Sequence, residues 1–366
     1  MAVTARPARP TIRDVAAVAG VSLGTASRAL NGHKNVSPGN VDRVRMAVSQ
    51  LGFQLNAHAR SLRSERSGTI GVLVSDIRNP FFAEIARAAE VVALENGYVT
   101  LLANADESVE QQDTYLRGMV SHRVDGLLVA PQGDGTGSLT EIVASGLPGV
   151  FVDRTIDGLD VPSVTSDSRP GLREALAHLR SLGHHRIGFI AGPQATSTGR
   201  ERMAVFLDEA RDAGIPQSPD LVAQGDFQAR SGEVGAHRLM SLATPPTALI
   251  AADSLMGFGA LVALKALGLR VGRDVSVIAF DDLPYASLFD PGLTVIDQDT
   301  EAMGRLAGEG LMAVIRGERP TPVVLPTRLV VRDSCRAPAP ARKLRVEAPA
   351  RSQGAPASHA ERQDLR

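Results

Sequence analysis

The pattern of apolar and polar positions divides the chain into parts with different periodicities. Within residues 11–54, apolar side chains recur every three or four positions, which predicts short amphipathic helices. Within residues 68–335, short apolar runs alternate with longer amphipathic segments, which predicts alternating strands and helices. Residues 1–10 and 336–366 lack this periodicity and are rich in Ala, Pro and Arg, so a disordered arm and a disordered tail are expected there.

Two short helices are predicted at the start of the first part. Thr11 is a suitable N-cap residue, and Asp14 places a carboxylate at the positive end of the first helix. Gly20 suits a left-handed C-cap, and Ser22 suits the N-cap of a second helix over residues 23–30. The apolar face of the first helix is expected to carry Val15, Ala16, Val18 and Ala19. This is a helix-turn-helix pattern, although a helical hairpin packed inside a larger domain has the same topology.

A third helix and a linker follow. Ser37 is expected to cap the third helix, with Pro38 at its first helical position. The apolar stripe of this helix consists of Val41, Val44, Val48 and Leu51. In residues 55–67, Asn56 could cap a short helix that runs through Leu62, whereas composition alone favours a flexible linker.

The second part is predicted to be α/β. Strands are expected at residues 70–74, 99–103, 126–130, 149–152, 187–191, 248–251 and 275–280. Helices are expected at residues 81–96, 109–122, 171–182, 200–213, 229–242, 255–267 and 301–315. Because the strands are apolar without interruption, we expect them to be buried on both faces in parallel sheets. The length of this part favours two lobes over one.

Composition is that of a soluble globular protein, with 43% hydrophobic and 22% charged residues. No signal-peptide pattern and no membrane-spanning apolar run is found, so we expect a cytoplasmic location and no membrane partner. Cys335 is the single cysteine, which excludes an intrachain disulfide framework and a cysteine-clustered zinc site. Residues 1–66 hold ten Lys and Arg against three Asp and Glu, although the whole chain has a net charge of −1. A basic head on an acidic body suits binding to a polyanion through one end.

The stretch from Thr11 to Asn31, TIRDVAAVAGVSLGTASRALN, resembles the lactose-repressor (LacI/GalR) family of transcription regulators. The family pattern is close to T-I-x-D-V-A-x-x-A-G-V-S-x-x-T-V-S-R-x-L-N. Only Ala26 departs from it, and this change replaces one apolar side chain by a smaller one. The resemblance implies that the second helix reads the major groove of double-stranded operator DNA.

The family's hinge-helix pattern, N-x-x-A-R-x-L, is matched by Asn56, Ala59, Arg60 and Leu62. In the family, hinge helices of two subunits fold together on the operator, and their leucines wedge into the minor groove. The resemblance therefore favours a hinge helix over a flexible linker in residues 55–67. The residues that it assigns to DNA contact are Thr11, Ser22, Leu23, Gly24, Thr25, Ser27, Arg28, Asn31, Asn35, Asn56, Arg60, Leu62 and Arg63.

From residue 68 onward the alternation resembles the periplasmic-binding-protein type I fold, which holds its ligand between two lobes. The expected fold class is an all-α helix-turn-helix headpiece joined to a two-lobed α/β effector-binding and dimerisation domain. Later crossings between the lobes would fall near residues 166–167, 297–298 and 327–329. The residues that the resemblance assigns to the effector are Asn79, Phe81, Phe82, Asp153, Arg202, Phe227, Asp253 and Asp281. Ala252 stands where the family usually has asparagine, which removes one amide group.

Several of these residues have simpler interpretations. Arg202 could form an ordinary salt bridge on a helix face. The Asp281-Asp282 pair could be turn residues, or a carboxylate pair for acid–base or metal chemistry. His184-His185 lacks metal-ligand spacing, and the glycine-rich segment 133–137 lacks the ending of a phosphate loop. No catalytic arrangement stands out, so we expect no enzyme activity, cofactor or metal.

The sequence thus favours a ligand-responsive transcription regulator, a nucleoid-associated repressor of carbohydrate-related genes that binds a pseudo-palindromic operator as a homodimer. A sugar effector is favoured over a purine, because a purine edge would be expected to use the amide that Ala252 lacks. The competing classes are a ligand-binding protein without DNA function and a sugar-modifying enzyme. Residues 336–366 contain no leucine heptads, so a tetramerising C-terminal helix is not expected.

Overall fold

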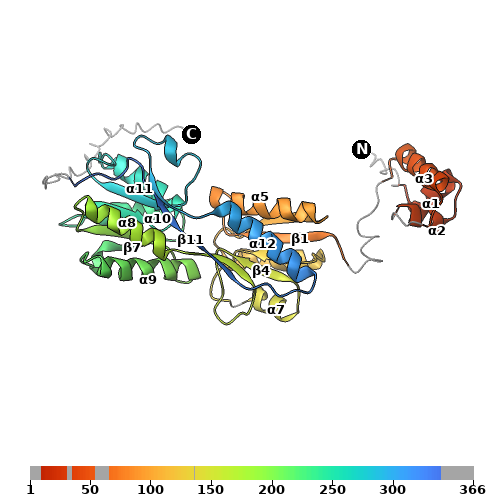
Figure 1. The fold of residues 1–366 in the computed structure, drawn as a ribbon, viewed down its shortest axis with the longest axis horizontal. Helices are drawn as coiled ribbons and strands as arrows, with labels where there is room; N and C mark the ends of the chain where they lie inside the picture. The colour runs from red at the N-terminus through yellow and green to blue at the C-terminus, as the bar shows by residue number, and fades with distance from the viewer. Residues whose placement is uncertain (1–9, 31–34, 54–65, 136, 339–366) are drawn as a thin grey trace, which may run out of the picture.

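The computed structural model describes residues 10–30, 35–53, 66–135 and 137–338 (Figure 1). They form a three-helix headpiece and a two-lobed α/β domain, the expected fold class. The arm, the tail beyond residue 338, the hinge-helix residues and Asn31 lie outside the described residues. No helix in the described ranges is long and apolar enough to cross a membrane.

The headpiece consists of α1 (Ile12–Ala19), α2 (Leu23–Leu30) and α3 (Pro38–Leu51) around a small core. Thr11 caps α1 in a reciprocal capping box with Asp14, as predicted. Its core consists of Val15, Ala16, Ala19, Ala26, Val44 and Ala47. These small side chains let the three helices approach closely, and Leu30, Val48 and Leu51 pack against them half-buried.

One detail predicted for the headpiece is wrong. Val18 is 46% exposed, because a helix of 3.6 residues per turn places it on the rim of the buried face that Val15 and Ala19 share. Ser37 stands at the N-cap of α3 and Pro38 follows at the first helical position, as predicted, although the Ser37 hydroxyl accepts no capping hydrogen bond. Its main-chain carbonyl accepts the first helical bonds instead.

The first lobe is a six-stranded parallel sheet in the order β11-β5-β4-β3-β1-β2. Its strands are β1 (Thr69–Val74), β2 (Val99–Asn104), β3 (Leu127–Val129), β4 (Gly149–Val152), β5 (Ser163–Asp167) and β11 (Val323–Pro326). Helices α5 (Pro80–Glu95) and α12 (Thr300–Ile315) share an apolar core with one face of the sheet. Helices α6 (Val109–Ser121) and α7 (Ser138–Ala144) share a second core with the other face.

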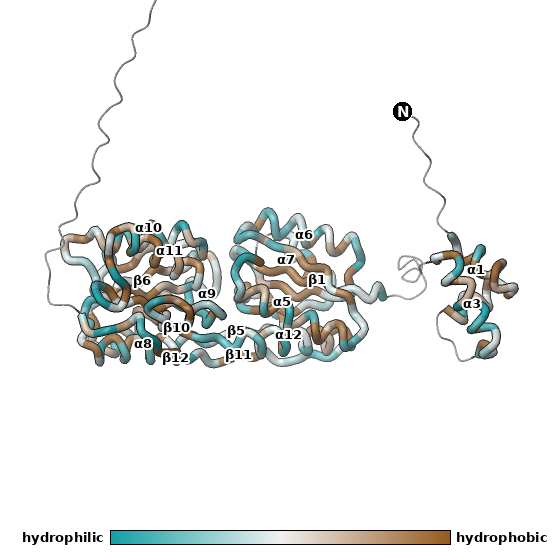
Figure 2. The backbone as a smooth tube through the Cα atoms, turned by 90° about the horizontal axis from the view of Figure 1, so that it is seen from above, coloured by the Kyte–Doolittle hydropathy of each residue, from teal (hydrophilic) through white to brown (hydrophobic). Residues whose placement is uncertain are grey.

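The second lobe repeats this plan with the strand order β12-β10-β9-β8-β6-β7. Its strands are β6 (Ile187–Ala191), β7 (Val222–Gln224), β8 (Ala248–Ala251), β9 (Ser276–Phe280), β10 (Thr294–Asp297) and β12 (Arg328–Val330). Its helices are α8 (Arg169–Ser181), α9 (Ser197–Asp212), α10 (Ala229–Met240) and α11 (Ser254–Ala266). Figure 2 shows the hydrophobic backbone positions gathered on the strands inside each lobe.

The chain crosses between the lobes after β5, after β10 and between β11 and β12, at the three predicted places. The crossings are bonded to one another. Thr327 N donates to Asp167 O at 3.3 Å, and Arg328 pairs with Asp297 at 2.7 Å. The three crossings therefore form one connected hinge beside the space between the lobes.

The sequence pattern missed α7 and five short strands, namely β5, β7, β10, β11 and β12. These strands are three to five residues long, and four of them carry polar side chains, so no apolar run marks those four. The fifth, β11, is a four-residue apolar run that ends in a proline, which argues against a strand. Two expectations about the sheets also need correction. The edge strand β2 exposes Val99, Leu101 and Leu102 instead of being buried on both faces. The last strand, β12, runs antiparallel to β10.

Candidate DNA interface and effector pocket

The second helix of the headpiece presents its first turn to solvent. Ser22 Oγ accepts a hydrogen bond from Thr25 N at 3.1 Å, which caps α2 as predicted. Ser22, Leu23 and Gly24 are exposed, whereas Ala26 is fully buried against the other helices. Small and polar side chains at the start of a helix are what a recognition helix needs to approach base edges in the major groove.

The structure describes some of the other residues that were predicted to contact DNA, but not all of them. Arg28 is exposed on α2, and its Nε donates to Gly24 O at 3.2 Å. Thr11 and Asn35 are also exposed, and Ser27 is half-buried. The predicted contacts that lie outside the described residues are Asn31, Asn56, Arg60, Leu62 and Arg63.

All eight residues predicted to bind the effector line one pocket between the lobes. Asn79, Phe81 and Phe82 come from the start of α5, and Asp153 follows β4. The second lobe supplies the rest, which are Arg202 on α9, Phe227 before α10, Asp253 at the start of α11 and Asp281 after β9. The pocket thus lies at the carboxyl ends of parallel strands, where such sheets bind ligands.

Three of these residues, Asp153, Phe227 and Asp281, have φ angles between 64° and 69°. This left-handed conformation is uncommon for a residue with a side chain and costs free energy. Strain of this kind gathers at functional sites, where it turns a side chain in a direction that a regular strand end would not allow.

Arg202 is buried, and the ion pair that it forms within the described residues is long, with Nη2 4.0 Å from Asp153 Oδ1. Its Nη1 donates to Ala252 O at 2.7 Å, and its Nη2 donates to Gln298 Oε1 at 3.3 Å. The guanidinium lies 4.3 Å from the centre of the Phe280 ring. Arg202 Nε has no hydrogen-bond partner among the described residues, so it can donate to a ligand.

Asp281 is an acceptor held by two donors. Gln298 Nε2 donates to Asp281 Oδ1 at 2.6 Å, and Ser254 Oγ donates to Asp281 Oδ2 at 2.8 Å. Its neighbour Asp282 instead pairs with Arg332 through both carboxylate oxygens. The two carboxylates therefore do not act as a pair, and no metal-binding group of three or more His, Cys, Asp or Glu occurs within the described ranges.

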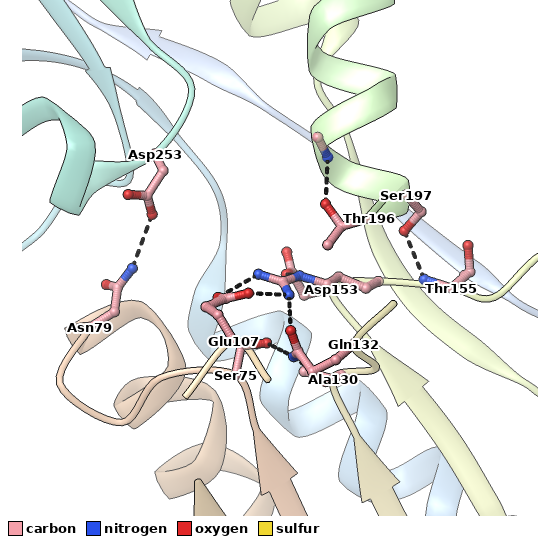
Figure 3. Close-up of polar contacts among 12 residues, drawn as sticks. Ser75, Asn79, Glu107, Ala130, Gln132, Asp153, Thr155, Thr196, Ser197 and Asp253 are labelled. Atoms are coloured by element: carbon pink, nitrogen blue, oxygen red, sulfur yellow. Dashed lines mark hydrogen bonds and ion pairs between the residues drawn. The ribbon is translucent and has the colours of Figure 1, made fainter. Parts of the chain in front are cut away.

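Asp253 joins the two lobes. Its Oδ1 accepts from Met256 N at 2.9 Å as the N-cap of α11, and its Oδ2 accepts from Asn79 Nδ2 at 3.2 Å (Figure 3). Burial raises the pKa of Asp253 to about 8, with the neighbouring Asp281 carboxylate adding to the rise. Burial likewise raises the pKa of Asp153 to about 6. The pocket therefore carries less negative charge near neutral pH than its carboxyl groups would give in water.

The sequence analysis missed Arg154, a second buried arginine in the pocket. Its guanidinium donates to both carboxylate oxygens of Glu107 at 2.7 and 2.8 Å, and to Gln132 Oε1 at 2.8 Å. It also lies 5.8 Å from the centre of the Phe82 ring and 5.1 Å from that of Phe227. Its position directly after Asp153 at a strand end was the signal that could have revealed it.

Thr198 and Gln298 also line the pocket without having been predicted as ligand contacts. Gln298 was placed only at a lobe crossing, although it bonds both Arg202 and Asp281. A single glutamine after a short strand carries no local signal of a ligand site, because its partners lie on distant segments.

Polar contacts close the lobes around the pocket. Thr155 N donates to Ser197 Oγ at 2.9 Å (Figure 3), and Arg200 pairs with Asp157 at 2.8 Å. The remaining cavity is about 10 Å³, room for about one water molecule. A cavity of about 780 Å³ lies next to it and shares three lining residues, Phe81, Asp281 and Gln298. A ligand therefore requires the lobes to separate or side chains to move.

Two family descriptions match the chain. "Bacterial regulatory proteins, lacI family" matches residues 11–56, and "Periplasmic binding protein-like domain" matches residues 176–335. The HTH-type transcriptional regulator CelR of Thermobifida fusca is 36% identical over 340 residues, which cover 90% of this chain and 99% of the relative. The chain belongs to the lacI family of bacterial regulatory proteins.

Other members of the lacI family agree with this. The HTH-type transcriptional repressor CytR of Escherichia coli strain K12 is 32% identical over 329 residues, or 89% of this chain and 96% of the relative. A Lac repressor dimer bound to operator and an anti-inducer covers 90% of this chain and 100% of its own, with a TM-score of 0.80 and 29% identity. The structure of a CelR–cellobiose complex matches with a TM-score of 0.66 and 35% identity. The match covers 89% of this chain and 100% of the CelR chain.

As a member of this family, the chain is a ligand-responsive DNA-binding transcription regulator and not an enzyme. The helix-turn-helix is thus the DNA-binding unit rather than an ordinary helical hairpin.

Proposed function

We propose that the chain represses carbohydrate-related genes and that a neutral sugar in the interlobe pocket controls it. The observation that carries this proposal is that all eight residues assigned from the sequence meet in one pocket. Phe81, Phe82 and Phe227 offer flat apolar surfaces, and Arg202 and Asp281 offer a donor and an acceptor. A sugar ring presents C–H groups on its faces and hydroxyls around its rim, which suits this combination.

The charges in the pocket favour a neutral ligand over a phosphorylated one. Glu107 already pairs with Arg154 through two hydrogen bonds, and its negative charge offsets the positive charge of the guanidinium. Arg154 would therefore attract a phosphate group only weakly. Two carboxylates, Asp153 and Asp281, face the same space and would repel an anion, and Asp253 adds to this repulsion above its pKa of about 8. The CelR complex contains cellobiose, which supports a sugar without naming this chain's own effector.

We propose that DNA binding uses the first turn of α2 in the major groove and residues 55–67 as a hinge helix. Leu62 would wedge into the minor groove and bend the operator. The exposed start of α2 supports the major-groove contact. The lacI family match extends through residue 56, which supports the start of the hinge helix. The protein would act in the cytoplasm, on the nucleoid.

We propose that the functional unit is a homodimer on a pseudo-palindromic operator. Lobe one exposes Val99 and Leu102 on the edge strand β2, and lobe two exposes Leu288 and Phe289. Contiguous exposed apolar side chains are typical of protein interfaces. The dimeric Lac repressor on its operator supports this arrangement. In such a dimer, sugar binding would change the angle between lobes and hence the spacing of the two hinge helices, a linkage between two sites.

A two-step experiment tests the proposal. A DNA fragment is first selected from a random-sequence pool by the full chain, and its inverted symmetry and salt dependence are measured. Thermal shifts are then recorded with D-ribose, D-glucose, cellobiose, glucose 6-phosphate and hypoxanthine, and each compound that binds is added to the protein–DNA complex. We expect a neutral sugar to raise the Tm and to change DNA affinity. Binding of hypoxanthine alone would support the purine alternative, and binding of the phosphate alone would contradict a neutral effector.

A further inference from the structure

The described residues that precede β1, residues 66–68, are anchored to the first lobe at the point where the linker from the headpiece enters it. Ser67 N and Gly68 N donate to the two carboxylate oxygens of Asp125, one to each oxygen, both at 2.8 Å. Such a carboxylate holds the direction of the backbone as well as its position, because both bonds must stay aligned.

A second anchor lies beside the first. Arg66 Nη2 donates to the main-chain carbonyl of Ile315 at 3.2 Å. Ile315 is the last residue of α12, where unpaired carbonyls and the helix dipole attract a cation. A Cβ on Gly126 would come within 3.0 Å of Ile315 Cδ1, so the end of α12 packs directly against the residue after Asp125. We call this pair of anchors, Asp125 and the Ile315 carbonyl, the linker joint.

The opposite end of α12 reaches the effector pocket. Gln298, two residues before the helix begins, bonds both Asp281 and Arg202. Asp299 then caps α12 by accepting from Ala302 N at 3.0 Å. The helix has 16 residues and is therefore about 24 Å long. One continuous helix thus runs from the pocket to the linker joint.

Close packing gives α12 little freedom to bend or slide independently of α5. A Cβ on Gly304 would approach Ile85 O to 2.4 Å, and one on Gly308 would approach Val92 Cβ to 3.1 Å. The two helices therefore touch with almost no side chain between them. Because Asn79, the N-cap of α5, also lines the pocket, both helices of this pair start at the effector site.

We propose that the linker joint positions the DNA-binding segment and that α12 carries changes in the effector pocket to it. A ligand that competes for Gln298 alters the bonds at the pocket end of α12. A displacement of the helix then moves the Ile315 carbonyl relative to Asp125, and with it residues 66–68. Asp125 and Arg66 are positioning residues, since neither lines the pocket. This inference rests on the proposed function.

A double-mutant cycle on DNA binding tests the joint without needing a known effector. The affinity of the full-length chain for its selected DNA fragment is measured for Gln298→Ala, Asp125→Asn and the combination. Independent changes at sites this far apart combine to within about twofold. We expect the DNA affinity of the double variant to differ by about threefold or more from the product of the two single effects. The same deviation is expected when Arg66→Met replaces Asp125→Asn. Asp160→Asn, at an exposed carboxylate of the same lobe, serves as the matched control and should combine independently with Gln298→Ala.

Amide hydrogen exchange provides a readout that needs no DNA. Gln298→Ala should change exchange at Ser67 and Gly68 by about threefold or more, whereas Arg305→Met on the exposed side of α12 should not. If a DNA fragment is selected but neither the cycle nor the exchange responds, the joint is overturned and the proposed function stands. If no DNA is selected while exchange responds, the proposed function fails, and only the coupling between the pocket and residues 66–68 stands. Unchanged circular dichroism of Asp125→Asn excludes general unfolding as the cause of its effect.

Discussion

Arg202 is the residue whose loss should separate ligand binding from DNA binding most clearly. Removing a hydrogen bond to a charged group costs about 1.5–3 kcal/mol, so Arg202→Ala should weaken binding of the sugar found in the thermal-shift panel by roughly 10- to 150-fold. DNA affinity without sugar should stay nearly intact. Calorimetry measures the first quantity and a gel shift the second. Arg211→Ala on the exposed side of the same helix is the control. Equal sugar affinity in both variants would mean that the effector binds elsewhere.

Asp253 predicts how stability depends on pH. Its folded-state pKa is about 8, whereas an unfolded aspartate titrates near 3.8, so the folded chain keeps a proton that the unfolded chain releases. The free energy of unfolding therefore falls as pH rises from about 4 through 8. Asp253→Asn keeps an N-cap for α11 but cannot ionise, so its stability should fall less between pH 7 and 9. Denaturant unfolding at both pH values measures this.

The pH interval from 7 to 9 also avoids the titration of His184, whose effect on the free energy of unfolding has the opposite sign to that of Asp253. Burial lowers the pKa of His184, so its contribution to stability is present above pH 6.5 and is lost below it. Between pH 7 and 9 His184 is neutral in the folded state and mostly neutral in the unfolded state. If wild type and Asp253→Asn lost the same stability across that interval, the buried proton would have to be assigned elsewhere.

At the scale of elements, the contact between α5 and α12 predicts opposite effects at two glycines of one helix. Gly304→Ala places a methyl group within 2.4 Å of the Ile85 carbonyl, which should destabilise the fold by about 1–3 kcal/mol. At Gly310 the nearest atom would be 3.8 Å away, so Gly310→Ala should stabilise by about 0.5–1 kcal/mol through helix propensity. Chemical denaturation of the two variants decides this, and a neutral Gly304→Ala would contradict the tight packing.

The recognition helix carries its own prediction. Arg28→Ala should weaken binding to the selected DNA by about 1–3 kcal/mol if the side chain contacts a base or a phosphate strongly. The helix itself should remain, because its core residue Ala26 and its cap Ser22 are unchanged. A gel shift reports the loss, with Arg305→Met as the control for a general charge effect. Full affinity in Arg28→Ala would remove this residue from the interface.

The elements that the sequence predicted are those with a strong local signal. The capping box at Thr11 and the apolar runs of β1, β6 and β8 could be identified because a few neighbouring residues define them. Strand β5, with the sequence SVTSD, has no such run and exists because β4 and β11 pair with it from both sides. Gln298 was missed for a related reason, since tertiary contacts alone bring it to the pocket.

At the scale of the whole molecule, the exposed strand β2 predicts a separable interface. Leu102→Glu adds a charge to a side chain that is 46% exposed, so the lobe should fold as before. In the proposed dimer this charge would be buried without a partner, which weakens association. Sedimentation velocity should show more monomer, with reduced affinity for the full operator. Val120→Glu, at a similarly exposed position on α6, is the control. A stable Leu102→Glu dimer would place the interface on another face.

The three bonded crossings also determine what kind of movement the two lobes can make. Adjacent segments that hydrogen-bond to one another form a ribbon, and a ribbon bends easily across its flat side but resists shear and torsion. The links from Thr327 to Asp167 and from Arg328 to Asp297 make the connection between the lobes such a ribbon. We therefore expect relative motion to change mainly the opening angle between the lobes. Filling the pocket then changes mainly this opening angle, whatever molecule fills it.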